Sequence, residues 1–148
     1  MTHRLTAVAA VAGAVAATAV LATSGAAQTG GTTLHIVGTP ERGVAFSPKG
    51  APHPGDRLGF GGKVSGDDSG FTRAICTVLG KKGESALPCT IWVHVSRGTL
   101  ALQGLLPERA RNTPIAVTGG TGAYNGAHGT AVVTDVSKTK TTIEIELL

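Results

Sequence analysis

The sequence lacks the motifs of the common hydrolases and metalloenzymes. It contains no Gly-x-Ser-x-Gly nucleophile elbow, no His-Glu-x-x-His motif, no second cysteine pair and no aspartate-rich calcium loop. Aromatic residues make up only 3% of the chain, and the net charge of +4 comes from dispersed basic residues. Because single strands of nucleic acid bind to aromatic rings set in basic grooves, nucleic-acid binding is not expected. We likewise expect no metal and no cofactor.

The sequence also lacks any convincing stretch with the 3.6-residue period of an amphipathic helix. After residue 30 the apolar residues alternate with period two, and Gly, Asp, Asn and Pro interrupt the pattern about every ten residues. This pattern predicts an all-β fold, an eight-stranded antiparallel β-barrel whose interior is filled by side chains or by one small ligand. The expected strands are residues 33–37, 57–64, 72–79, 89–96, 99–104, 114–118, 129–137 and 141–148.

The N-terminus resembles a secretory signal peptide. His3 and Arg4 precede the apolar stretch 5–21, and small residues follow, so that cleavage after Ala26 or after Ala27 fits equally well. Residues 1–27 are then the signal, and residues 28–148 form one secreted, extracellular domain without membrane contact. An uncleaved N-terminal anchor is the alternative.

The chain has only two cysteines, Cys76 and Cys89, on either side of a turn built around residues 80–83. In an exported protein such a pair predicts a disulfide between adjacent antiparallel strands. A reactive thiol is the functional alternative. The connection 38–56 contains four prolines, and we expect it to form a flap over one end of the barrel.

Residues 114–130 contain five glycines between two short strands, a pattern typical of a structured turn. The run lacks the Lys-Ser/Thr ending of a P-loop and the third glycine of a dinucleotide fingerprint, so nucleotide binding is not expected. We expect Tyr124 to pack within the turn rather than to act as a catalytic phenol. The residues assigned to the turn are Gly119, Gly120, Gly122, Tyr124, Gly126 and Gly129.

Few titratable residues are candidates for chemistry. The pair Asp67-Asp68, flanked by Gly and Ser, indicates a solvated turn rather than a metal site. Two histidines, His35 and His94, fall within expected strands and are interpreted as structural. Asp135 lies in a strand of small and apolar residues; pointing inward it could act as an acid or base, and pointing outward it would be a surface residue.

The order of these features resembles the allene oxide cyclase and dirigent superfamily. The similarity includes Gly55-Asp56 with Phe60 and Lys63, then Cys76, then Gln103-Gly104, and above all the stretch from Ala116 to Ala127 followed by Gly129. This resemblance implies an eight-stranded, lipocalin-like barrel with a central hydrophobic pocket, assembled as a homotrimer or homodimer. Its members cyclise an unsaturated fatty-acid epoxide or steer the coupling of phenolic intermediates, chiefly by positioning a reactive molecule.

The chain departs from the cyclases at three positions. The pocket glutamate and asparagine of those enzymes correspond here to Gly38 and Pro40, so the acidic group that assists epoxide opening is absent. Cys76 matches a pocket cysteine of the cyclases, but here it has Cys89 as an expected partner.

Three hypotheses for function follow. The first is an exported barrel that binds a small hydrophobic molecule and steers its cyclisation or coupling. The second is a cofactor-free cyclase or isomerase with Asp135 or Asp56 as acid or base, and the third is a structural β domain with no catalysis. The pattern leaves open whether Trp92 forms a pocket wall or a subunit contact. The expected pocket lining is Leu34, Ile36, Phe60, Ile75, Trp92, Gln103 and Val133.

Overall fold

The structure is a computed structural model, and it describes residues 31–41, 52–80, 86–107 and 109–148. The expected signal peptide and most of the expected flap lie outside the described residues. Within the described ranges, no helix is long and apolar enough to cross a membrane.

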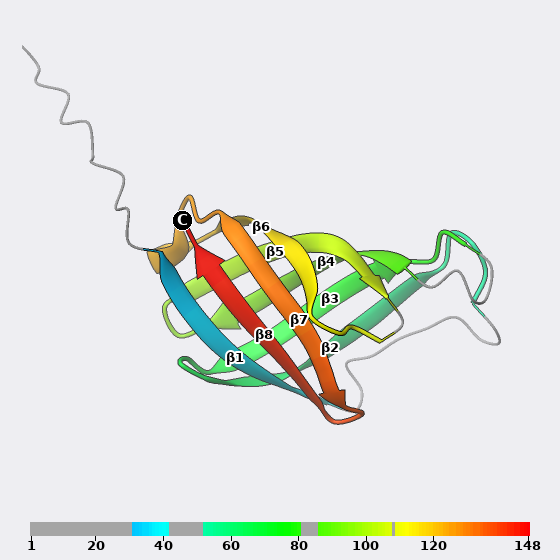
Figure 1. Ribbon diagram of the computed structural model, residues 1–148, viewed down its shortest axis with the longest axis horizontal. Coiled ribbons are helices and arrows are strands. Elements are labelled where there is room, and N and C mark those ends of the chain that lie inside the picture. The colour runs from blue at the N-terminus through cyan, green and yellow to red at the C-terminus, as the bar shows by residue number, and fades with distance from the viewer. Residues whose placement is uncertain (1–30, 42–51, 81–85, 108) are drawn as a thin grey trace, which may run out of the picture.

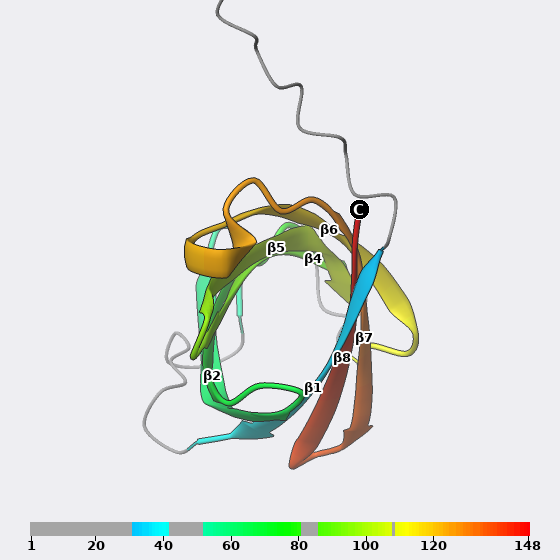
Figure 2. The same cartoon turned by 90° about the vertical axis from the view of Figure 1, so that its left-hand side faces the viewer.

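Eight antiparallel strands form one closed barrel, in which each strand pairs with its neighbours in sequence and β8 pairs with β1 (Figures 1 and 2). The predicted fold is therefore confirmed. The strands are β1 (Thr32–Pro40), β2 (Arg57–Gly66), β3 (Gly70–Thr77), β4 (Ala86–Val95), β5 (Gly98–Pro107), β6 (Thr113–Gly120), β7 (Gly129–Ser137) and β8 (Lys140–Leu147). One 3-10 turn, η1 (Gly122–Tyr124), lies between β6 and β7.

Alternation of apolar and polar residues decides which face of each strand points inward. In β8, Ile143 and Ile145 are buried while Glu144 and Glu146 are exposed, as expected for a strand with one wet side. The register pairs Ile143 with Ile36 of β1 and with Val133 of β7, which brings three inward apolar side chains into one row. A slip of one residue would turn two carboxylates inward, so the sequence pattern specifies this register.

The observed strands differ from the expected ones mainly at their ends. Strand β1 continues to Pro40 because it pairs with both β2 and β8, and β3 ends at Thr77, two residues before the expected end. After Thr77 the chain leaves the ladder: the amide of Val78 donates to the carbonyl of Asp56, and the amide of Gly55 donates to the carbonyl of Val78.

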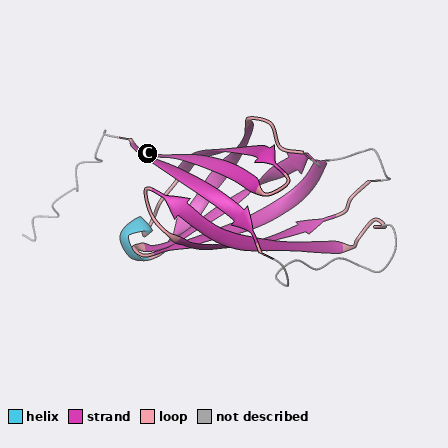
Figure 3. Ribbon diagram, turned by 90° about the horizontal axis from the view of Figure 1, so that it is seen from below, coloured by secondary structure: helices cyan, strands magenta, loops and turns pink. Residues whose placement is uncertain are grey.

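The barrel has two different ends. At the turn end, short connections join β2 to β3 and β4 to β5, and η1 joins β6 to β7 (Figure 3). At the loop end lie the connections from β1 to β2, from β3 to β4, from β5 to β6 and from β7 to β8.

Candidate functional site

The middle of the barrel is filled by the protein's own side chains. Five large apolar residues on inward faces are almost completely buried: Ile36, Val93, Leu100, Leu102 and Ile145. They come from β1, β4, β5 and β8, so they meet from different sides of the cylinder. Leu34 and Val133, two expected pocket residues, are also buried in this core.

Several inward side chains near the loop end are only partly covered. Phe60 lies on the inward face of β2, because its register partners Ala74 and, beyond it, Ile91 face inward, but 46% of Phe60 is exposed. Pairing with β1 covers only Gly62 to Gly66, so the first half of β2 has no strand on that side. Phe60 is therefore an inward side chain that is only partly covered, and its expected role as a pocket residue stays a prediction.

Three further apolar side chains of the loop end pack only partly against the core: Ala74, Leu87 and Leu106. Leu58, one row beyond Phe60, is also partly exposed. None of these four was singled out from the sequence. Their alternation with buried residues was visible, but the incomplete cover at this end depends on how the barrel closes.

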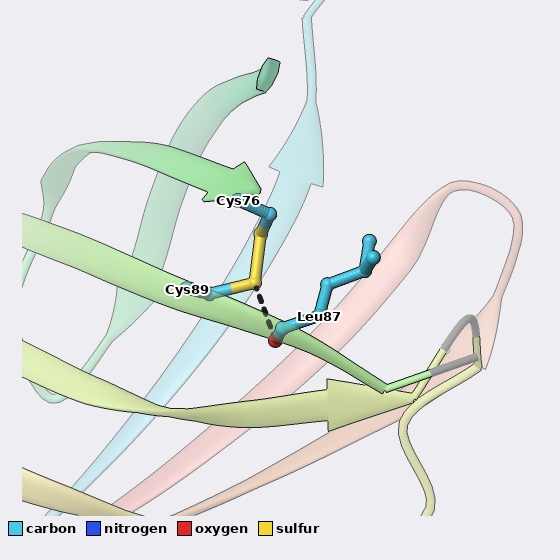
Figure 4. The surroundings of a disulfide bond; sticks show 3 residues. All are labelled: Cys76, Leu87 and Cys89. Carbon is cyan, nitrogen blue, oxygen red and sulfur yellow. Dashed lines mark hydrogen bonds between the residues drawn. A yellow bond between two sulfur atoms is a disulfide. The ribbon is translucent and has the colours of Figure 1, made fainter. Parts of the chain in front are cut away.

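The expected disulfide is formed between Cys76 and Cys89 (Figure 4). The two cysteines are directly paired on β3 and β4, and both side chains are buried on the inward face. Cys89 Sγ also lies 3.4 Å from the carbonyl oxygen of Leu87. The bond joins two strands in the row next to Phe60, so it braces the wall of the loop end.

Asp135 points inward at the loop end. It follows Ala131 and Val133 on the inward face of β7, and it pairs with Thr141 of β8. Its Oδ2 accepts from the amide of Ala110 at 2.9 Å, and its Oδ1 accepts from the hydroxyl of Thr141 at 2.9 Å. The Asp135 amide in turn donates to the carbonyl of Ala110. The carboxylate therefore holds the buried Ala110, and with it the β5–β6 connection, against the barrel.

Asp56, the other candidate acid or base, caps a tight turn. Its Oδ2 accepts from the amide of His53 at 2.7 Å, and its own amide donates to the carbonyl of His53. His53 Nδ1 lies 3.7 Å from the same oxygen. These contacts give Asp56 a structural use in a connection at the loop end.

The turn end is closed by Tyr124, which is 5% exposed and belongs to the core. The expectation that Tyr124 packs within the glycine turn is therefore met. Gly122 and Gly126 have φ of 63° and 74°, values that favour glycine. A Cβ on Gly120 would lie 2.4 Å from the carbonyl oxygen of Tyr124, so this glycine permits the close approach. The Tyr124 hydroxyl is buried and has no hydrogen-bond partner among the described residues.

Asp68 joins two hairpins at the turn end. Its Oδ1 accepts from the amide of Ser69 at 2.7 Å and from the hydroxyl of Ser96 at 2.8 Å. The Ser96 hydroxyl, and next the Ser69 amide, hold the pKa of Asp68 below its ordinary value. Asp67 Oδ2 accepts from the amide of His35 at 2.8 Å. Both aspartates thus serve the turn, as the sequence indicated.

An open depression of about 370 Å³ lies beside Asp68, between Ser69-Gly70 and the segment from His94 to Gly98. Most of its polar groups contact one another, although Asp68 Oδ2 is buried and accepts no hydrogen bond among the described residues. Arg97 Nε lies 3.6 Å from Asp68 Oδ2, and the guanidinium lies 5.4 Å from the centre of the Tyr124 ring. His94 Nδ1 is 2.8 Å from the hydroxyl of Thr99. The depression therefore reflects the fastening of two turns, and we do not assign a ligand to it.

Three expected pocket residues lie on the outer face of the barrel: Ile75, Trp92 and Gln103. Trp92 is 38% exposed and alternates with the buried Ile91 and Val93. The same alternation turns Gln103 outward, next to the inward Leu102, and Ile75 outward, next to the inward Cys76. The expectation that these three residues line the interior is therefore wrong. The reason is that strand alternation permits only one face to point inward, and the smaller aliphatic residues occupy it.

Two positions that distinguish the chain from the cyclases lie on the inward side of β1. Gly38 is buried and pairs with Val64 and with Thr141, whereas Pro40 ends the strand. No side chain larger than these projects from β1 at the loop end. Among the described residues, no group of three or more His, Cys, Asp or Glu residues could hold a metal ion.

Comparison with known proteins finds similarity only at the level of structure. No family model matches the sequence, and no curated protein matches it. A pyocyanin demethylase structure is similar with a TM-score of 0.68 at 21% identity, over 79% of this chain and 100% of that one. The pterocarpan synthase dirigent protein GePTS1 is similar with a TM-score of 0.57 at 20% identity, over 79% of this chain and 82% of that one. At these identities the likeness supports the barrel fold alone.

Proposed function

We propose that this protein is an exported barrel that binds a small, largely apolar molecule at the loop end and holds it in one orientation. The observation that carries the proposal is the exposure of Phe60 on an inward face, beside the partly covered Leu58, Ala74, Leu87 and Leu106. Ligand sites in proteins are typically concave, apolar and supplied with few polar groups. The similarity to a dirigent protein and to a demethylase of a small molecule is consistent with this use of the fold.

The packed middle of the barrel limits the size of the ligand. Ile91 is 6% exposed and Leu102 is fully buried, and both lie in the same row as Phe60. A ligand at the loop end would therefore rest on this layer rather than pass through the barrel. We expect a compact molecule of one or two rings rather than an extended lipid chain.

The polar groups near the opening favour orientation of a ligand over acid–base catalysis. Both oxygens of Asp135 accept hydrogen bonds that hold Ala110 and Thr141, and Asp56 caps its own turn. Steering of a cyclisation or coupling would then depend on shape, which lowers the entropic cost of reaching a reactive conformation. A reactive intermediate would have to be generated elsewhere.

A binding screen tests this proposal. The neutral dye N-phenyl-1-naphthylamine is titrated first, followed by native mass spectrometry against terpenoids, phenolics and fatty acids. We expect dye fluorescence to rise on binding and one- or two-ring compounds to displace the dye. Phe60→Ala should weaken dye binding about tenfold, since a buried aromatic side chain contributes on the order of 1.5–3 kcal/mol.

Phe71→Ala is the matched control, because Phe71 is 41% exposed but lies on the outer face of β3. It should leave dye binding unchanged. Equal losses in both variants would mean that the dye does not distinguish the inward ring from the outward one, and would contradict the proposal.

A structural β domain without a ligand is the second candidate. It is favoured by the close packing of Val93, Leu102 and Ile145, each with no exposed surface. This candidate predicts that no compound of the screen binds and that Phe60→Ala changes nothing but stability.

A further inference from the structure

The outer face of β3 and β4 carries a cluster of three rings and one guanidinium group that the proposed ligand site does not use. Four outward side chains form it: Phe71, Arg73, Trp92 and His94. Phe71 is 41% exposed and Trp92 is 38% exposed. We call these four residues the aromatic face. On a strand of a soluble protein such outward rings usually mark a contact surface.

Small residues flank the aromatic face on both sides. In one row across the sheet, Gly61, Arg73, Trp92 and Ala101 are consecutive register partners. The two large side chains thus lie side by side, with small residues on both flanks. A Cβ on Gly61 would lie 3.0 Å from Cδ and Nη1 of Arg73, so the glycine leaves room for the arginine to lie across the sheet.

Arg73 is held in place without a carboxylate. Its guanidinium carbon is 4.9 Å from the centre of the Phe71 ring, and Nη1 donates to the carbonyl of Thr72 at 2.8 Å. Phe71 in turn contacts His94, with ring centres 4.7 Å apart. Strands β2 to β6 contain no Asp or Glu, and Arg73 forms no ion pair within the described part of the chain. The guanidinium therefore has one ring contact and one hydrogen bond, and its other N–H groups are available to a partner.

The arrangement is complementary to itself. A two-fold axis in the plane of the interface, parallel to the strands and between β3 and β4, exchanges the positions of register partners. It places Arg73 of one copy above Trp92 of the other, and Phe71 of one copy above His94 of the other. Each guanidinium would then lie between two rings, a favourable cation–π geometry, and the two arginines would not face each other.

We propose that the aromatic face is the interface of a symmetric homodimer, in which Arg73 of each copy packs on Trp92 of the other. The same axis sets Gly61 above Ala101, so that the sheets can approach at the margins. Face-to-face sheets pack about 10 Å apart with nearly aligned strands, which this axis permits. Trp and Arg at the centre of a patch are the residues that most often dominate binding energy in protein interfaces.

The opposite side of the barrel has the character of a solvated surface. Strand β8 presents Glu144 and Glu146 outward, and His35 of β1 lies beside Glu144 with Nδ1 and Oε1 4.0 Å apart. Because β8 is four strands from β4 in the eight-stranded barrel, a head-to-tail contact between the acidic side and the aromatic face would continue as a filament. Only the symmetric contact closes on itself.

Sedimentation velocity of the exported domain at about 1 μM to about 1 mM tests for the dimer, together with the emission maximum of Trp92. We expect one monomer–dimer equilibrium and a blue shift of the emission as the dimer forms, since the indole leaves water. A protein that stays monomeric over this range, or that forms a trimer or a filament, would overturn the proposal.

A residue exchange tests the register of the interface. Trp92→Arg sets arginine against arginine and should raise the dimer dissociation constant at least about thirtyfold, the effect of a typical hot-spot residue. The double variant Arg73→Trp with Trp92→Arg restores each pair with the partners reversed, and it should dimerise again. Glu144→Arg on the opposite side is the control and should dimerise like the wild type.

Both variants alter outward side chains, Trp92 exposed and Arg73 half-buried, and circular dichroism checks that each variant keeps a cooperative unfolding transition. A double variant that stays monomeric while the wild type dimerises would exclude this axis. If Trp92→Arg dimerises as tightly as the wild type, the aromatic face is not the interface at all.

Discussion

The two ends of the barrel close in different ways. At the turn end, the buried Tyr124 and the carboxylate of Asp68 fasten short connections onto the core. At the loop end, apolar side chains on inward faces stay partly uncovered, and a disulfide and Asp135 brace the wall instead. The difference shows that one strand pattern leaves the cover of each end to its connections, a buried ring at the turn end and a disulfide with a carboxylate at the loop end.

The largest expected effect is a loss of unfolding free energy on truncating a core leucine, and it should be greater in the packed middle than at the loop end. Leu102 is fully buried, so Leu102→Ala should destabilise the protein by about 2–5 kcal/mol, the cost of a cavity that cannot collapse. Leu106, four residues along β5 on the same face, is only partly buried, so Leu106→Ala should cost roughly half as much. Urea unfolding of both variants measures this. Equal losses would mean that the loop end is as closely packed as the middle.

Removing the disulfide should weaken the loop end next most strongly. The cysteines are 13 residues apart in sequence, for which the chain-entropy model gives about 3 kcal/mol. Cys76→Ala with Cys89→Ala should lower the unfolding free energy by about this amount in urea. Addition of dithiothreitol should destabilise the wild type but not the double variant. If the thiols of the wild type become titratable in dithiothreitol but its unfolding free energy does not fall, the prediction is wrong.

The contribution of Asp68 to the turn end should depend on pH. Its pKa in the folded protein is lowered, so its stabilising effect is present above the unfolded value of about 4 and is lost as the pH falls through the folded value. The difference in unfolding temperature between the wild type and Asp68→Asn should therefore shrink below about pH 4. Glu146→Gln, an exposed change on β8, is the control. A difference that stays constant down to pH 2 would contradict the assignment.

The smallest effect is expected at the Tyr124 hydroxyl. This oxygen is buried with no hydrogen-bond partner among the described residues, so Tyr124→Phe should leave stability unchanged or raise it by up to about 1 kcal/mol. Thermal unfolding measures the change. Thr72→Val is a parallel case at a wall of the barrel, because within the described ranges Thr72 Oγ1 is also buried without a hydrogen-bond partner. A loss above about 1 kcal/mol in Tyr124→Phe would show that the hydroxyl is bonded.

Local pattern was sufficient for most of the fold but for little of the site. The alternation in β8 and the cysteine pair predicted a strand face and a cross-strand bond, because both depend on neighbours in sequence or across one turn. For Trp92 the pattern left a pocket wall and a subunit contact open, and its inclusion in the expected pocket lining was wrong, because the alternation of β4 turns it outward. Asp135 could not be placed, since its partner Ala110 is 25 residues away.

By itself, the sequence determined an all-β chain of eight strands, a disulfide and a glycine turn, because spacing of apolar, cysteine and glycine residues acts over short distances along the chain. Only the tertiary structure decided that Phe60 is partly exposed on an inward face, that Asp135 holds Ala110 and that Arg73 lies beside Trp92 on the outside. Those relations arise when the barrel closes and its register brings distant strands together, and no single segment contains that information.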